Sequence, residues 1–135
     1  MNTTQIEQEI SKPMSSQKPS VEEVFGMMRQ MMGSVPTAIE QAVKVDEGLL
    51  YEHLRSRGYA MPPNGALDEE ARTLIYLASA LASGSQACIQ AMANKAKMQN
   101  IPSAKVLETV RIVRFALATK VIGEAEPVFA ALAKT

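Results

Sequence analysis

Residues 68–92 read DEEARTLIYLASALASGSQACIQAM, and this stretch predicts two consecutive helices separated by a glycine. The first helix begins at Asp68, where the acidic first turn suits the positive end of the helix dipole. Gly84 interrupts the helical pattern, and Ser85 is the expected N-cap of a second helix that ends at Asn100. The inward face of the first helix is expected to carry five apolar residues: Leu74, Ile75, Ala78, Leu81 and Ala82.

Helix signals continue toward the N-terminus. Ser20 and Glu23 have the spacing of a capping box, so a helix is expected over residues 21–32, before Gly33. Two short helices follow over residues 37–45 and 47–57, the second closed by Gly58, and residues 58–67 read as the clearest loop. The helix over residues 21–32 carries an apolar stripe, which predicts a face buried in the core or in a subunit interface: Val24, Met27, Met28, Met31 and Met32.

Two further helices are expected toward the C-terminus. Pro102 and Ser103 begin a long helix that is expected to end at Gly123. A last short helix runs from about Pro127 to Ala133. The inward side chains of the long helix are expected to be Val106, Val110, Val113 and Leu117.

No strand pattern occurs in this reading, so the sequence predicts an all-α fold of six or seven helices. Aromatic residues make up only 4% of the chain and there is no tryptophan, whereas β-rich cores usually contain more aromatic and β-branched residues. Residues 1–19, with Pro13 and Pro19, are expected to form a flexible arm with a short helical turn near Ile6 to Ile10. Residues 20–135 are expected to form one helical domain.

Charge and composition exclude several classes of protein. Lys plus Arg and Asp plus Glu both number 14, and a broad nucleic-acid surface would need an excess of basic residues. No apolar run is long enough to span a membrane, and the polar N-terminus does not resemble a signal peptide. A single cysteine cannot form an internal disulfide, so a cytoplasmic protein is expected. No cofactor and no metal are expected.

The single cysteine, Cys88, is the first candidate for chemistry. With Ser85 as the N-cap, Cys88 occupies the third position of its helix, where the helix dipole and free N–H groups favour a thiolate. Helical spacing places Met92 on the same face, one turn along, where a catalytic base would be expected. Cys88 is therefore either a reactive thiol or a small apolar residue that fills the core.

The spacing between residues 72 and 108 points to a known family. Residues 72–75 (RTLI) align with an Arg-Glu-Leu-Ile element, and residues 85–88 (SQAC) align with a Cys-x-x-Cys pair. Met92 falls where the pattern has a histidine, and Glu108 matches a frequent glutamate further along. With a similar lead-in over residues 33–54, the chain resembles the carboxymuconolactone decarboxylase and AhpD-like alkylhydroperoxidase family over roughly residues 20–122.

The resemblance implies an AhpD-like helical bundle and places three substitutions in the family site. In redox-active relatives, two cysteines reduce a hydroperoxide while a glutamate and a histidine relay protons. Those positions are held here by Thr73, Ser85 and Met92, with Cys88 at the second cysteine. Serine cannot resolve a sulfenic acid, and threonine and methionine cannot shuttle protons at neutral pH, so the two-cysteine cycle is excluded within one chain.

Two other residues are accessory candidates. His53, the only histidine, could approach the site from an earlier helix or across a subunit boundary, or it could face solvent near a helix end. Arg72 could bind an anionic ligand. Lactone decarboxylases of the family also carry a histidine at the position of Met92, so their reaction would need another acid or base in this chain.

Three hypotheses for function follow. The first is a peroxiredoxin-like, antioxidant thiol peroxidase or oxidoreductase that uses Cys88 on a hydroperoxide, with an external thiol as resolver. The second is a catalytically degenerate member that binds a ligand or partner without redox turnover, and the third is a lactone decarboxylase-type enzyme. The resemblance also implies a homo-oligomer, a trimer or hexamer, which the methionine-rich first helix and the alanine-rich faces would suit.

Overall fold

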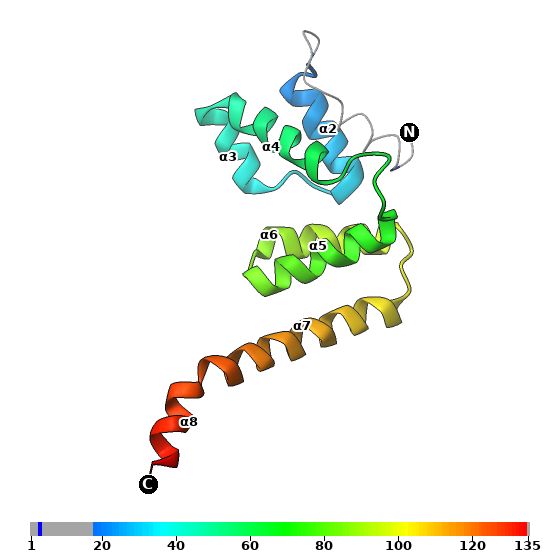
Figure 1. Ribbon diagram of the computed structural model, residues 1–135. Coiled ribbons are helices and arrows are strands. Elements are labelled where there is room, and N and C mark those ends of the chain that lie inside the picture. The colour runs from blue at the N-terminus through cyan, green and yellow to red at the C-terminus, as the bar shows by residue number, and fades with distance from the viewer. Residues whose placement is uncertain (1–2, 4–17, 135) are drawn as a thin grey trace.

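The computed structural model describes residue 3 and residues 18–134, and this part of the chain contains seven helices and no strand (Figure 1). The prediction of an all-α fold is therefore confirmed. The expected helical turn near Ile6 to Ile10, and all of the proposed arm except residues 3, 18 and 19, lie outside the described residues.

The first three described helices form one half of the molecule. They are α2 (Val21–Met32), α3 (Thr37–Val45) and α4 (Glu47–Ala60). The predicted cap of α2 is present, because the Ser20 hydroxyl accepts the Glu23 N–H at 3.1 Å, and Gly33 ends the helix with a left-handed φ of 85°. Asp46 ends α3 and caps α4 by accepting the Gly48 N–H at 2.9 Å.

The core of this half is built mainly from the predicted stripe of α2. Val24, Met28 and Met31 are buried, whereas Met27 and Met32 are half-buried. The other buried members of this cluster come from the turn after α2 and from α4: Val35, Leu50 and Leu54. The methionine stripe therefore packs against side chains of its own chain.

The predicted end of α4 at Gly58 is wrong, because the helix continues to Ala60. Gly58 is not among the glycines with positive φ, so it does not provide the left-handed turn that ends a helix. The helix stops at Met61, whose φ of −133° and ψ of 68° lie outside the helical region. Pro62 follows, and a proline disfavours the helical conformation of the residue before it.

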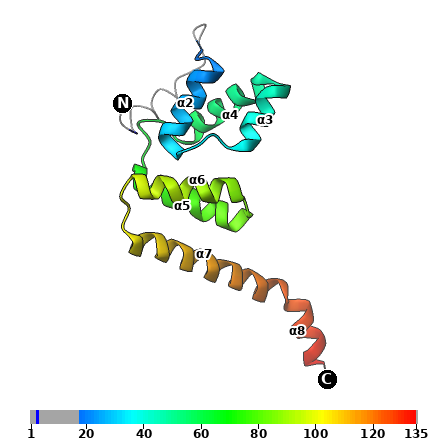
Figure 2. The same ribbon diagram turned by 180° about the vertical axis from the view of Figure 1, so that it is seen from behind.

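Helices α5 (Glu69–Ser83) and α6 (Gln86–Met98) form an antiparallel hairpin beside this half (Figures 1 and 2). Asp68 caps α5 by accepting the Ala71 N–H at 2.8 Å, and Gly84 ends it with a left-handed φ of 75°. Beyond α6, Asn100 adopts the predicted left-handed conformation with a φ of 55°. Residues 68–92 thus fold as the expected helix pair.

The buried face of α5 differs from the predicted one. Thr73, Leu77 and Ala80 are buried, whereas Ile75 is 52% exposed and Ala82 is exposed. The other three predicted residues, Leu74, Ala78 and Leu81, are only partly buried. The apolar pattern missed this face because a polar threonine and a small alanine occupy two of its three positions.

Helices α7 (Ser103–Glu124) and α8 (Glu126–Ala133) complete the chain, and α7 contacts α5 before leading away from the body (Figures 1 and 2). Gly123 lies inside α7, so the predicted end at that residue is wrong by one position. Of the four side chains predicted to face inward, only Val113 is buried; Val110 and Leu117 are exposed. The outer part of α7 and all of α8 carry apolar residues that no described part of the chain covers: Ile112, Phe115, Val121, Ile122, Val128, Phe129 and Leu132.

Candidate functional site

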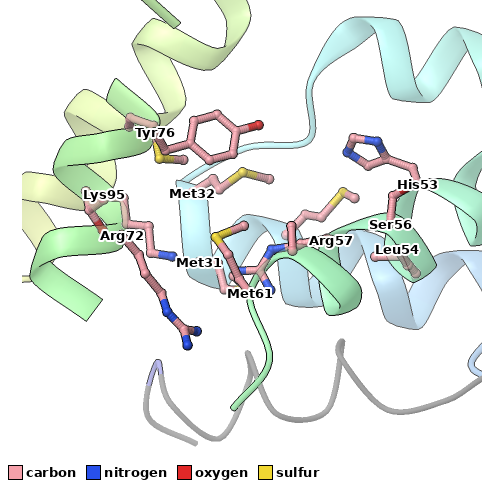
Figure 3. A pocket seen from close by; sticks show the side chains of 14 residues that line it. Met31, Met32, His53, Leu54, Ser56, Arg57, Met61, Arg72, Tyr76 and Lys95 are labelled. Atoms are coloured by element: carbon pink, nitrogen blue, oxygen red, sulfur yellow. The ribbon is translucent and has the colours of Figure 1, made fainter. Parts of the chain in front are cut away.

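A cavity of about 270 Å³ lies between the α2–α4 half and the α5–α6 hairpin (Figure 3). Helix α2 contacts α6 here, and the Asn94 amide of α6 donates to the Met32 carbonyl of α2 at 3.3 Å. This contact connects the two halves beside the cavity. Much of the wall is apolar and includes five methionines, together with Leu54 and Ala60: Met28, Met31, Met32, Met61 and Met92.

The charged side chains among the described lining residues are all basic. They are Arg57 from α4, Arg72 from α5 and Lys95 from α6, and His53 also lines the cavity. In Figure 3 the Lys95 amine and the Arg57 guanidinium extend toward the middle of the cavity from opposite sides. Lys95 is only 6% exposed, which is rare for a lysine. This concentration of basic groups in an apolar wall favours a negatively charged occupant.

Arg72 is held at the edge of the cavity by the loop between α4 and α5. Its Nε donates to the Leu67 carbonyl at 3.1 Å, and its Nη2 donates to the Pro62 carbonyl at 2.6 Å. Figure 3 shows its guanidinium directed away from the groups that face the cavity centre. Arg72 therefore fixes the loop beside the cavity and adds positive charge at its margin.

Thr73 lies at the family's glutamate position and is 2% exposed. Its hydroxyl donates to the Gln99 side-chain carbonyl at 2.8 Å, which links the first part of α5 to the end of α6. Thr73 lines the cavity, but the proton of its hydroxyl is already engaged in this bond. A threonine in this arrangement holds two helices together and supplies no proton relay.

Cys88 is a free, half-buried thiol, and it is not among the residues that line the cavity. Its sulfur lies 3.5 Å from the hydroxyl of Tyr76, a residue of α5 that does line the cavity. The hydrogen bond to Cys88, partial burial and the electrostatic interaction with Cys88 raise the pKa of Tyr76 to about 12. Tyr76 is protonated at neutral pH, and either its hydroxyl or the thiol can be the donor in this contact.

Ser85 stands at the predicted N-cap of α6, but its side chain makes no capping hydrogen bond. Its ψ of 95° is extended, as are the ψ values of the three residues whose side chains do cap helices, which are 160° for Ser20, 107° for Asp46 and 171° for Asp68. The expected N-cap position is correct, and the expected side-chain bond is not formed.

The structure brings together four of the six predicted site residues. Thr73, Met92, His53 and Arg72 all line the cavity, whereas Ser85 and Cys88 lie outside its lining. His53 combines the two alternatives left open by the sequence, because it is exposed and also lines the cavity. The substituted family positions are thus split between the cavity and the first turn of α6.

The sequence reasoning missed three residues of the site: Arg57, Tyr76 and Lys95. Each follows a recognised candidate at helical spacing, since Arg57 is four residues after His53 and Lys95 is three residues after Met92. Tyr76 is likewise three residues after Thr73. Continuing the helical spacing from each candidate would therefore have found them.

Two searches of the described residues were negative. In residues 3 and 18–134, no group of three or more His, Cys, Asp or Glu side chains is placed to hold a metal ion. Within the same residues, no helix combines the length and apolar character needed to cross a membrane.

Comparison with known proteins identifies the family. The chain matches the family model "Carboxymuconolactone decarboxylase family" over residues 50–131, which is more than half of its length. The matched region runs from α4 into α8 and includes the α5–α6 hairpin with all the family-site positions. A search of curated proteins found no match. The chain belongs to the carboxymuconolactone decarboxylase family.

Proposed function

We propose that this protein binds a small organic anion, an apolar molecule with a carboxylate, in the cavity between its two halves, and that it has no thiol redox cycle. One observation carries the proposal. The cavity has an apolar wall rich in methionine, and the charged side chains among its described lining residues are all basic. An apolar wall binds the body of such a ligand, and a few placed polar groups orient its head.

The thiol peroxidase hypothesis has less support. A thiol peroxidase needs a base or cation that stabilises the thiolate, and a route by which the peroxide reaches it. The hydroxyl beside the Cys88 sulfur belongs to Tyr76, which is neither a cation nor a base at neutral pH, and Cys88 does not line the cavity. We therefore favour ligand binding over redox turnover at Cys88.

A lactone decarboxylase-type reaction is the second candidate function, and His53 favours it. His53 lines the same cavity as Arg57, Arg72 and Lys95. An imidazole can donate or accept a proton near neutral pH, and the neighbouring basic groups would stabilise a carboxylate or a developing enolate. A lactone that is consumed by the wild type but not by His53→Asn would support this candidate, whereas binding without product would support the simple ligand-binding function.

The binding proposal is tested by calorimetry with pairs of matched ligands. Benzoate and hexanoate are compared with benzamide and hexanamide, which keep the apolar body and lose the charge. The acids should bind at least about tenfold more tightly than the amides, because a charge-assisted hydrogen bond contributes about 1.5–3 kcal/mol. Equal affinity for acids and amides, or no binding of either, would reject the proposal.

We also propose that α7 and α8 associate with another copy of the chain, as the resemblance to a family of trimers and hexamers implies. Burial of their exposed apolar side chains would stabilise an assembly, and the zero net charge offers little electrostatic repulsion. Phe115 is 73% exposed near the middle of α7. Phe115→Glu should dissociate the oligomer in light scattering, whereas Gln41→Glu, at an exposed residue of α3, adds the same charge away from α7 and α8 and should leave the oligomer intact. A monomeric wild type would reject this proposal.

The compartment stays a prediction from composition. A cytoplasmic location agrees with the single cysteine, which cannot form an internal disulfide. Cell fractionation with antibody detection tests it, and recovery of the protein outside the cytoplasmic fraction would contradict it.

A further inference from the structure

An open apolar groove of about 550 Å³ lies next to the cavity, between the loop that follows α4 and the outer side of α5. Residues of that loop form one side, with Pro62, Ala66 and Leu67, and Ile75 of α5 is on the other. Four residues line both the groove and the cavity: Ala60, Met61, Arg72 and Tyr76. The two spaces are therefore adjacent and share one wall.

The groove leaves large apolar side chains in water. Leu67 and Ile75 are each 52% exposed, although they face a concave surface. The one charged residue among its described lining residues is Arg72, and two backbone carbonyls already accept hydrogen bonds from that guanidinium. The surface of the groove is thus suited to an apolar group without charge.

We propose that the cavity and the groove are one binding site for a carboxylate with an extended apolar chain. The head lies near Arg57 and Lys95, and the chain passes between Met61 and Tyr76 onto Leu67 and Ile75. This inference rests on the proposed function, because the carboxylate end is the same. It adds the class of ligand, a straight-chain acid or a compound with a similarly long apolar tail.

The volumes agree with this assignment. The cavity of about 270 Å³ is just below the range of roughly 300–1,000 Å³ that is usual for small-molecule sites. The groove of about 550 Å³ brings the combined site well inside that range. A short acid would occupy the cavity alone, whereas a longer acid needs the additional space.

Met61, in the wall that the cavity and the groove share, has a side chain that can make room for a ligand chain. Methionine is unbranched and flexible, so the side chain of Met61 can change rotamer around a passing chain. Arg72 keeps the neighbouring loop in place through the Leu67 and Pro62 carbonyls, so the far side of the groove is fixed. The four lining residues that the two spaces share favour one ligand over a separate partner protein in the groove.

The test is a series of straight-chain acids, from butanoate through hexanoate, octanoate and decanoate to dodecanoate, titrated by calorimetry below their micelle concentrations. Each added methylene that is buried should raise affinity roughly three- to fourfold, and the increase should continue to the longest acids. Ile75→Ser should reduce the affinity for decanoate and dodecanoate several-fold and leave butanoate within about twofold. Leu49→Ser, the same kind of change at a 52% exposed residue of α4 that lines neither the cavity nor the groove, is the control and should leave the whole series unchanged.

The possible failures are distinguishable. If no acid binds, the proposed function is wrong and this inference falls with it. If short acids bind but affinity stops rising after hexanoate, the cavity binds the anion and the groove has no part. If Ile75→Ser dissociates an oligomer while the chain-length series keeps its slope, the groove is a subunit contact, and the inference is again wrong.

Discussion

The two ends of α6 differ in what surrounds them. Its first turn carries Ser85 and Cys88, outside the cavity, and the hydroxyl beside the sulfur belongs to Tyr76. Its later turns carry Met92 and Lys95, both buried and both lining the cavity. The family's cysteine positions and its histidine position therefore lie in different environments along one helix. The difference teaches that one helix can hold a thiol outside the cavity at one end and a buried lysine in the cavity wall at the other.

Removing the charge at the cavity end should have the largest effect. Lys95→Met should weaken binding of benzoate by about ten- to a hundredfold, because it removes a charged donor from an apolar wall. Replacement of a buried lysine by a methionine is usually compatible with folding, so the variant should keep its helical circular dichroism. Lys97→Met, at an exposed lysine two residues later in α6, is the matched control and should change affinity less than twofold. Equal losses of affinity in both variants would show that Lys95 does not contact the bound anion.

The link between α5 and the end of α6 should contribute measurably to stability. Thr73→Val keeps the shape of the side chain but removes the hydroxyl that donates to Gln99. Because a partly buried acceptor is left without its donor, the free energy of unfolding should fall by about 1–3 kcal/mol in urea denaturation. Thr119→Val removes an exposed hydroxyl on α7 that donates to the Phe115 carbonyl, and it should change stability by less than about 0.5 kcal/mol. Similar losses in the free energy of unfolding for the two variants would show that the Thr73–Gln99 hydrogen bond contributes no more to stability than an exposed one.

The Tyr76–Cys88 contact predicts a dependence of stability on alkaline pH. The pKa of Tyr76 is raised to about 12 in the folded chain, whereas a tyrosine in the unfolded chain has a pKa of about 10. The folded state therefore binds more protons in this window, so the stabilisation is complete below about pH 10 and is lost as pH rises to about 12. The free energy of unfolding of the wild type should fall more steeply between these values than that of Tyr76→Phe. Parallel curves for the two proteins would contradict the contact.

The smallest effect is expected at the cysteine itself. Cys88→Ser should change the affinity for benzoate less than twofold, because Cys88 does not line the cavity. Purified wild type should consume no more hydroperoxide than Cys88→Ser when an excess of dithiol is supplied. Peroxide consumption that disappears in Cys88→Ser would restore the one-cysteine peroxidase hypothesis. The functional end of α6 would then be the one that carries Cys88.

Local signals in the sequence were sufficient for most of the fold. Ser20, Asp68 and Gly84 marked helix ends correctly because each forms its bonds or its left-handed turn with residues close in sequence. Gly58 and Gly123 gave wrong predictions of helix ends, since a glycine can also continue a helix where no left-handed turn is needed. Proline two residues beyond the true end of α4 was the stronger signal.

The candidate site was only partly readable from the sequence, because it depends on contacts between distant segments. The family spacing located Thr73 and Met92, which share the cavity, but it also grouped them with Ser85 and Cys88, which do not line it. His53 lies some twenty residues before Thr73 along the chain, and only the packing of α4 beside the hairpin brings the two together. The apolar pattern of α7 could not reveal that the outer part of this helix is uncovered. Its burial depends on which other helices extend alongside it, and the sequence of α7 does not contain that information.

The central claim, that an organic anion binds among the methionines of the cavity, is tested most directly by methyl NMR. Protein carrying labelled methionine methyl groups is titrated with benzoate, and the signals are assigned with single Met→Leu variants. We expect shifts at the cavity methionines and none at Met98, which is 47% exposed on α6 and does not line the cavity: Met28, Met31, Met32, Met61 and Met92 should all respond. Unchanged cavity signals at saturating benzoate, or shifts confined to Met98, would contradict the account.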